Sequence, residues 1–371
     1  MITYNLILAV SVIAGIPLCR NKAGKIVYCV LAGLMLFLVA ALRSRVGYDY
    51  NSYAAAYIYS VPETLEEISY DRMEKGYLMI TKLLADYVVG FQILFVVIAA
   101  VITVPVMIFV YRHCEKPYLA VFGFLTFGVY FNSLCFLRQT VAAVIVMCGL
   151  KYIEKGNFFR FAAVVIFASC FHISAVIMFL FYFLLKIKIT PTVLSVYAAA
   201  SAVIFTFSYE IMVFVTRFFY SNYNPASNPH MMNGLTPIYT IFFGAVFIIA
   251  FLLRKPLLEK DEFNSILINC MFFTVFFELI GIKHSIVARP SLYFALPASV
   301  ALIPQIFDAM IQKCSERFKD DKHKQTVSKT AAVMAVMMLC VGMYEYLISE
   351  DYNGVMPYRT IFSDEMYESG E

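Results

Sequence analysis

Long apolar stretches with almost no charged residues constrain the fold of this chain more than any other feature. There are about ten of them, and the longest reach the roughly 20 residues that a helix needs to cross hydrocarbon. Since 61% of the residues are hydrophobic and only 15% are charged, a soluble globular domain is excluded. No alternation typical of barrel strands is present. The sequence therefore predicts an all-α fold, a polytopic integral membrane helical bundle with about 10–12 crossings.

Two weaker apolar segments and eleven strong ones define the expected helices. Residues 76–90 are amphipathic and precede a long span, and residues 210–220 read as an interfacial helix. The first run has no basic segment before it, so it reads as a span and not as a cleaved signal peptide. The candidate spans are residues 2–19, 26–42, 91–111, 118–134, 139–152, 160–185, 191–208, 236–253, 263–281, 291–311 and 330–348.

Loop charge predicts the orientation of the bundle. Lysine and arginine dominate loops 20–25, 112–117, 151–160 and 312–329, which we expect on the cytoplasmic side. The other long loops, 43–76 and 209–235, are expected outside together with an acidic tail at 350–371. Residues 1–349 would then form a single transmembrane domain.

Residues 160–185 leave two topologies open. They form either one long span or two short helices that meet outside near His172. Only the hairpin keeps loops 186–189, 254–262 and 312–329 all cytoplasmic, so we favour it. It gives a bundle in which both termini lie outside.

Charged residues at the outer ends of these spans are the candidate site. Charge beside hydrocarbon is costly and therefore indicates function. Arginine matches phosphate oxygens in a bidentate manner, whereas histidine and carboxylates serve as bases. The simpler alternatives are snorkelling anchors, helix-start acids and a histidine satisfied by a backbone carbonyl. Candidate catalytic residues are His172, Asp49 and Glu74, and candidate substrate-binding residues are Arg43, Arg45, Arg138, His284 and Arg289.

Several reaction classes have no support in the sequence. None of the nine cysteines forms a CxxC pair, so we expect neither a metal site nor disulfides. P-loop, GxGxxG, HExxH and GxSxG motifs are absent, so nucleotide hydrolysis and metalloprotease chemistry have no support in the sequence. No cofactor is expected, and the basic residues lie in membrane-flanking loops and do not indicate nucleic acid.

Six short motifs occur in an order that resembles the EpsG family, a branch of the Wzy-like polysaccharide polymerases. The resemblance covers essentially the whole chain, and Arg43, Asp49, Glu74, Arg138, His172 and Arg289 match family motif positions. Arg45 and His284 are added from charge placement alone. The final motif, in the tail, also suggests docking onto the bundle. The motifs are RSRVGYDYNSY (43–53), MEKGY (73–77), FLRQTV (136–141), SCFHISA (169–175), IKHSIVARPSLYF (282–294) and VMPYRTIF (355–362).

The resemblance implies a fold, an activity and partners. The fold would be that of the C superfamily of membrane glycosyltransferases. The activity would be polymerisation of undecaprenyl-pyrophosphate-linked oligosaccharide repeat units into exopolysaccharide or capsule, at the outer face of the bacterial cytoplasmic membrane. Partners would be that lipid-linked oligosaccharide, membrane lipid, and a flippase and a chain-length regulator of the same pathway.

The residues support this independently and leave rivals open. A donor that carries its own pyrophosphate leaving group needs interfacial arginines, for which Arg138 with Arg43 or Arg289 are candidates. The acceptor hydroxyl needs a base, for which His172 or Asp49 are preferred. A flippase would need charges open to both sides, a ligase would share the donor site, and an acyltransferase would draw on a cytoplasmic thioester.

Overall fold

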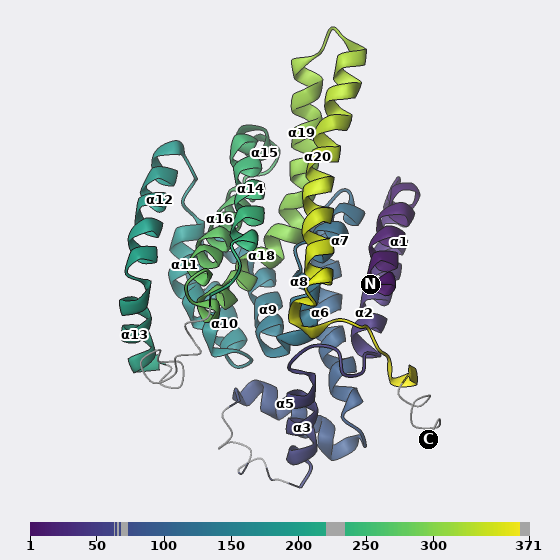
Figure 1. Cartoon of the computed structure of the whole chain (residues 1–371), viewed down its shortest axis with the longest axis vertical. Coiled ribbons are helices and arrows are strands. Elements are labelled where there is room, and N and C mark those ends of the chain that lie inside the picture. Colours follow the sequence, from purple (N-terminus) through teal and green to yellow (C-terminus); the bar gives the residue numbers. More distant parts are fainter. Residues whose placement is uncertain (63, 65–66, 68–72, 220–233, 364–371) are drawn as a thin grey trace.

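A computed structural model describes the chain except residues 63, 65–66, 68–72, 220–233 and 364–371. Within the described residues every regular element is a helix, and the only paired extended backbone is an isolated bridge between Arg43 and Thr360. Most helices run side by side along one axis, as Figure 1 shows. The all-α prediction is confirmed.

The first helices form a pair that leads into a small helical layer at one end of the bundle. Asn21 begins the second helix because its side chain accepts a hydrogen bond of 2.8 Å from the backbone N–H of Gly24. The predicted amphipathic segment 76–90 is confirmed as α5. These helices are α1 (Ile2–Leu18), α2 (Lys22–Ala41), α3 (Tyr50–Ser60), α5 (Lys75–Tyr87) and α6 (Gln92–His113).

The expected span 118–134 is broken into α7 (Pro117–Thr126) and α8 (Val129–Cys135), which differ in direction by 59°. Gly128 lies between them with φ of 71°, a left-handed conformation that ends α7 and that glycine adopts without strain. After a further break at Phe136, α9 (Leu137–Glu154) begins.

The chain reverses within 160–185. Helix α10 (Phe158–Ser169) is followed by the 3-10 turn η1 (Ile173–Ile177) and by α11 (Met178–Leu185). The ring of Phe158, where α10 begins, lies 5.6 Å from that of Phe183, where α11 ends. The two helices are therefore antiparallel, and the predicted hairpin is confirmed with His172 at its turn.

Two further bent pairs precede a nearly straight span. The bend between α12 and α13 is 72°, as expected if residues 210–220 turn into the interface, and that between α14 and α15 is 67°. The elements are α12 (Pro191–Thr206), α13 (Ser208–Phe219), α14 (Ile238–Leu252), α15 (Arg254–Lys260) and α16 (Asn264–Gly281).

The last part of the bundle is an almost continuous helix followed by a long antiparallel partner. The first includes a π-helical stretch, η5, a distortion that proteins tolerate within α-helices. The elements are α17 (Ser285–Ala288), η4 (Arg289–Ser291), α18 (Leu292–Pro297), η5 (Ala298–Leu302), α19 (Ile303–Arg317), α20 (Lys322–Ser349) and η6 (Tyr352–Gly354).

Five helices in the described residues are long and apolar enough to cross a membrane, or up to eight if each bent pair crosses as one span. Helices α1, α10 and η1–α11 are apolar but shorter. They pack in the same bundle (Figure 1), and the expected 10–12 crossings would need these short helices and α9 as well. The protein is a polytopic helical membrane protein.

Ion pairs lie at one end of the bundle, which we call the basic end. This end holds the turns 19–21, 114–116, 155–157, 186–190, 261–263 and 318–321. The Asp308 carboxylate accepts from Nζ of Lys116 at 2.6 Å and of Lys260 at 2.9 Å. The four loops predicted to share the cytoplasmic side all lie here. The opposite end, with α3, α5 and the C-terminal segment, we call the tail end (Figure 1).

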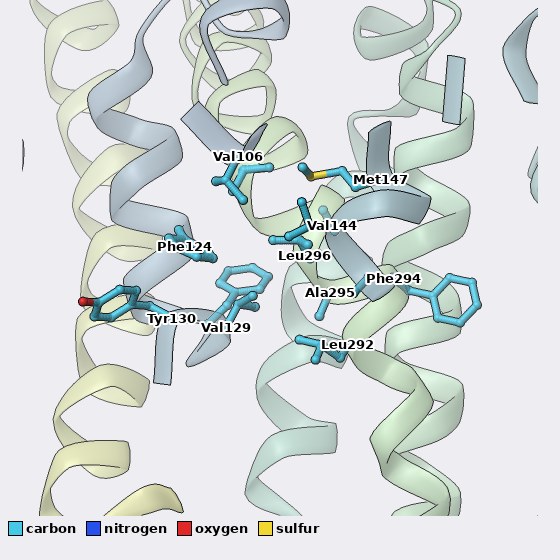
Figure 2. Close-up of a cluster of buried hydrophobic side chains, with 14 of the residues drawn as sticks. Val106, Phe124, Val129, Tyr130, Val144, Met147, Leu292, Phe294, Ala295 and Leu296 are labelled. Carbon is cyan, nitrogen blue, oxygen red and sulfur yellow. The ribbon is translucent and has the colours of Figure 1, made fainter. Parts of the chain in front are cut away.

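Large apolar side chains from α6, α7, α8, α9 and α18 fill the centre of the bundle. Figure 2 shows Val106 of α6, Phe124 of α7, Val144 of α9 and Leu296 of α18 directed toward one another. All four are at most 2% exposed. Close packing of this kind holds helices together where lipid replaces water and helix association depends on van der Waals contact.

The C-terminal segment docks onto the tail end, as the motif at 355–362 predicted. The Tyr358 hydroxyl donates to the carbonyl of Val39 at 3.1 Å, and the backbone N–H of Ser44 donates to the carbonyl of Arg359 at 3.0 Å. Residues 364–371 of the predicted acidic tail lie outside the described residues.

Candidate functional site

Three segments far apart in sequence converge at the tail end. Glu74 begins α5, Arg138 lies in the first turn of α9, and His172 lies between α10 and η1. We call these three residues the Glu74 cluster. Their side chains are between 14% and 24% exposed, so the cluster is mostly shielded but still open to a ligand.

Local backbone contacts explain why the segments meet. The backbone N–H of Gly76 donates to the carbonyl of Cys170 at 2.9 Å, which attaches the start of α5 to the turn of the α10–α11 hairpin. A Cβ at position 76 would lie 2.7 Å from that oxygen, so only glycine permits the approach. The hairpin turn thus places His172 beside Glu74.

The Glu74 carboxylate is the centre of the cluster. Its Oε1 accepts hydrogen bonds from His172 Nδ1 at 2.8 Å and from the backbone N–H of Ile173 at 3.1 Å, while Oε2 pairs with the guanidinium of Arg138. Burial raises the pKa of Glu74, but the His172 hydrogen bond and the Arg138 charge outweigh it and lower the pKa to about 2. Glu74 is therefore ionised, and a poor base.

Aromatic residues surround the guanidinium of Arg138. It lies 5.9 Å from the centre of the Tyr77 ring, and the Tyr53 hydroxyl lies nearby. Its Nε is buried with no hydrogen-bond partner in the described residues. The cation is thus held in place with one donor still unused.

Arg289 and Asp49 adjoin the cluster. The carbonyl of Arg289 accepts from Gln139 Nε2 at 2.6 Å, and Gln139 is the neighbour of Arg138 in the chain. The guanidinium of Arg289 lies 5.2 Å from the Phe136 ring centre, and this residue is exposed. Burial raises the pKa of Asp49, although the nearby charges of Arg289 and Arg138 oppose the rise.

The three remaining candidates lie elsewhere. Arg43 is 1% exposed, stacks on Phe95 at 4.8 Å and donates to the carbonyl of Ala40 at 2.7 Å, so it faces inward under the C-terminal segment. His284 is also 1% exposed, and its Nε2 lies 3.2 Å from the hydroxyl of Ser208.

Arg45 is exposed, with φ of 53°, and within the described ranges it forms neither a hydrogen bond nor an ion pair with the cluster. Arg45 and His284 were predicted only from the presence of charge at the end of a span. Such a position does not determine the direction in which the side chain points. Arg43, Arg45 and His284 therefore lie outside the candidate site.

The structure adds residues that sequence reasoning missed. The hydroxyls of Ser174 and Tyr293 lie 2.9 Å apart and join the hairpin turn to α18. The carboxyl of Glu278 accepts from Ser291 at 2.7 Å, close in sequence to Arg289. An acid in the otherwise apolar run 263–281 was the available signal for Glu278.

Among the described residues no group of three or more histidine, cysteine, aspartate or glutamate side chains is placed to hold a metal ion. What the site offers is two arginines, an imidazole fixed by a carboxylate, and aromatic rings. This set can bind an anion and accept a proton beside it.

Comparison with known proteins identifies a family. A family model, that of the EpsG family, matches residues 26–360, a range that contains all eight candidate residues. No curated protein and no solved structure matches the chain.

Proposed function

This chain belongs to the EpsG family, and we propose that it joins undecaprenyl-pyrophosphate-linked oligosaccharide repeat units into a surface polysaccharide, as exopolysaccharide or capsule. The family supports a membrane polymerase role in general. The lipid-linked donor, the glycosyltransferase reaction and the outer face of the bacterial cytoplasmic membrane are our proposal.

The Glu74 cluster is the observation that carries the proposal. Glu74 binds the Nδ1 side of the His172 ring, so Nε2 is the nitrogen left to meet a substrate. A carboxylate in this position orients an imidazole and stabilises its protonated form. His172 is thus the base, Glu74 its orienting partner, and Asp49 the second acidic group.

The proposed reaction forms one glycosidic bond and breaks one. The hydroxyl of the acceptor sugar gives its proton to His172, and its oxygen attacks the anomeric carbon of the donor sugar. The bond from that carbon to the pyrophosphate oxygen breaks, and undecaprenyl pyrophosphate leaves with the bonding electron pair. No nucleotide is consumed.

Two arginines would stabilise the charge that develops on the leaving group. Arg289 is exposed and has no carboxylate within 4.0 Å in the described part of the chain, so its charge is available to an anion. Arg138, whose side chain is 24% exposed, adds a second positive charge beside it. Removing one donor aimed at developing charge typically lowers a rate by about 100- to 1000-fold.

The rival functions differ in what the site must do. A flippase for lipid-linked oligosaccharides needs a cationic cavity that opens to both sides, whereas the Glu74 cluster and Arg289 lie together at the tail end. This favours an enzyme. A glycan ligase would use the same donor chemistry and would differ only in its acceptor.

Complementation of a deletion strain tests the proposal. We expect wild-type protein to restore long polymer, and Arg138→Ala and His172→Ala to fail at matched membrane levels. Arg317→Ala and His323→Ala, exposed residues near the turn at the basic end, are the matched controls and should restore polymer fully.

Three outcomes would count against the proposal. Long polymer from both cluster variants would refute the site. Repeat units accumulating only on the cytoplasmic leaflet of the deletion strain would identify a flippase, and full-length polymer that remains on lipid would identify a ligase.

A further inference from the structure

An apolar groove runs between α2 and α6 on the outside of the bundle, where the two helices lie side by side (Figure 1). Its volume is about 740 Å³. It lies along the part of both helices nearest the basic end. It is lined by Ile26, Cys29, Val30, Gly33, Leu34, Phe37, Ala100, Thr103, Val104, Met107, Ile108, Tyr111 and Arg112.

The groove is shaped by small and large side chains on facing helices. At Gly33 a Cβ would lie 3.0 Å from Cγ of Met107, so the absence of a side chain there lets the helices approach. Val30 and Val104 stand on the two helices and are 62% and 56% exposed. In a membrane these surfaces face lipid, and the groove accommodates a flexible hydrocarbon chain.

A basic pocket of about 480 Å³ continues the groove at the basic end and shares Tyr111 and Arg112 with it. The ammonium of Lys25 lies 4.9 Å from the Tyr111 ring centre. The pocket is lined by Cys19, Arg20, Asn21, Lys22, Lys25, Tyr111, Arg112 and Glu115.

Charge in this pocket is strongly unbalanced. Its four cations have no carboxylate partner within 4.0 Å in the described residues, and the one acid, Glu115, pairs instead with Lys260 at 3.7 Å. Each unpaired cation near a membrane surface attracts anionic lipid. A negative group bound here would be neutralised by residues of α2 and α6 and of the turn before α2.

We propose that this groove and pocket form a binding site for an anionic phospholipid, with one acyl chain in the groove and the phosphate among Arg20, Lys22, Lys25 and Arg112. An apolar groove that continues into a cationic pocket matches the acyl chain and the phosphate of a phospholipid. The four cations would stabilise an anionic headgroup more than a zwitterionic one. The site lies at the end opposite the Glu74 cluster and is independent of the proposed function.

The complete absence of tryptophan makes the test direct. Val30→Trp places a single fluorophore at the groove, and Met338→Trp places one on α20, where the side chain is 62% exposed to lipid as well. The purified protein is reconstituted into phosphatidylcholine vesicles that contain increasing fractions of phosphatidylglycerol with brominated acyl chains, which quench tryptophan.

We expect brominated phosphatidylglycerol to quench the groove probe far more than its mole fraction in the vesicle would give. The probe on α20 should be quenched only in proportion to that mole fraction. In the Val30→Trp background, Lys25→Gln with Arg112→Gln should weaken this preference about fivefold for each cation removed. Lys319→Gln with Lys322→Gln, exposed at the same end, should leave it unchanged.

Equal quenching by brominated phosphatidylglycerol and brominated phosphatidylcholine at the groove probe would overturn the proposal. A preference for phosphatidylglycerol that survives the Lys25 and Arg112 changes would overturn it as well. If undecaprenyl phosphate competes for the groove better than phosphatidylglycerol does, the proposal of a phospholipid as the ligand would be wrong. Failure of the cluster variants to lose polymerase activity would bear only on the proposed function.

Discussion

The pair between Glu74 and Arg138 makes a quantitative prediction about stability. Their side chains are 14% and 24% exposed, so the pair lies between exposed pairs, worth less than about 1 kcal/mol, and buried pairs, whose disruption costs about 3–5 kcal/mol. We expect Arg138→Gln alone, or Glu74→Gln alone, to destabilise the protein by about 2 kcal/mol, because each leaves one charge without its partner.

The double variant distinguishes this reasoning from a simple loss of contacts. Since both charges are then absent, Glu74→Gln with Arg138→Gln should also cost about 2 kcal/mol and not the sum of the two, a coupling of about 2 kcal/mol. Polymer formation should not recover, because the amide at position 74 no longer holds His172 as a carboxylate does.

Thermal unfolding in detergent gives the readout, followed with a dye that reacts with the buried thiols of Cys270 and Cys340. At about 2–4 °C per kcal/mol, each single variant should lower the apparent Tm by about 5 °C. The exposed pair Lys188–Glu262, at 2.9 Å, is the control and should couple by less than about 0.5 kcal/mol. Additive effects at the first pair would refute the reasoning.

Three further predictions concern the pH dependence of stability, the docked C-terminal segment and the membrane topology. The lowered pKa of Glu74 means that its charge stabilises the fold fully above pH about 4.5, and that this contribution is lost as pH falls toward about 2; the Tm difference between wild type and Glu74→Gln should therefore shrink in acid. Truncation after Ser349 should lower the apparent Tm, because the hydrogen bonds of the docked segment are lost; an unchanged Tm would contradict the docking. In a cysteine-free background, Lys188→Cys and Lys322→Cys should react with an impermeant thiol reagent from the same side of the membrane, and Arg45→Cys from the other; labelling of Lys188→Cys together with Arg45→Cys would contradict the topology.

Much of the fold follows from hydropathy because lipid imposes it. A backbone in hydrocarbon must satisfy its own hydrogen bonds, so apolar runs of sufficient length become helices. Loop charge also favoured the hairpin at 160–185, which the packing of Phe158 on Phe183 confirms. The break at residues 127–128, inside the expected span 118–134, was not predicted, since a bend depends on which neighbour fills the space beside the helix.

The candidate site was predictable in composition and not in geometry. Sequence could identify Glu74, Arg138 and His172 as costly charges, yet nothing in their spacing indicates that one carboxylate binds both partners. Arg43 is a charge at a span end that lies outside the cluster. It ends a span as Arg138 begins one, but its side chain turns inward because the C-terminal segment covers it.

The docked C-terminal segment has a consequence for how the protein is made. Tyr358 reaches back to Val39 across 319 residues, and Thr360 pairs with Arg43. During synthesis the loop after α2 must therefore wait for nearly all later helices to be inserted before its last partners exist. Contacts at such sequence separation form late, so the tail end matures at the close of biogenesis, and a chain stalled before residue 353 would keep that loop exposed to membrane proteases.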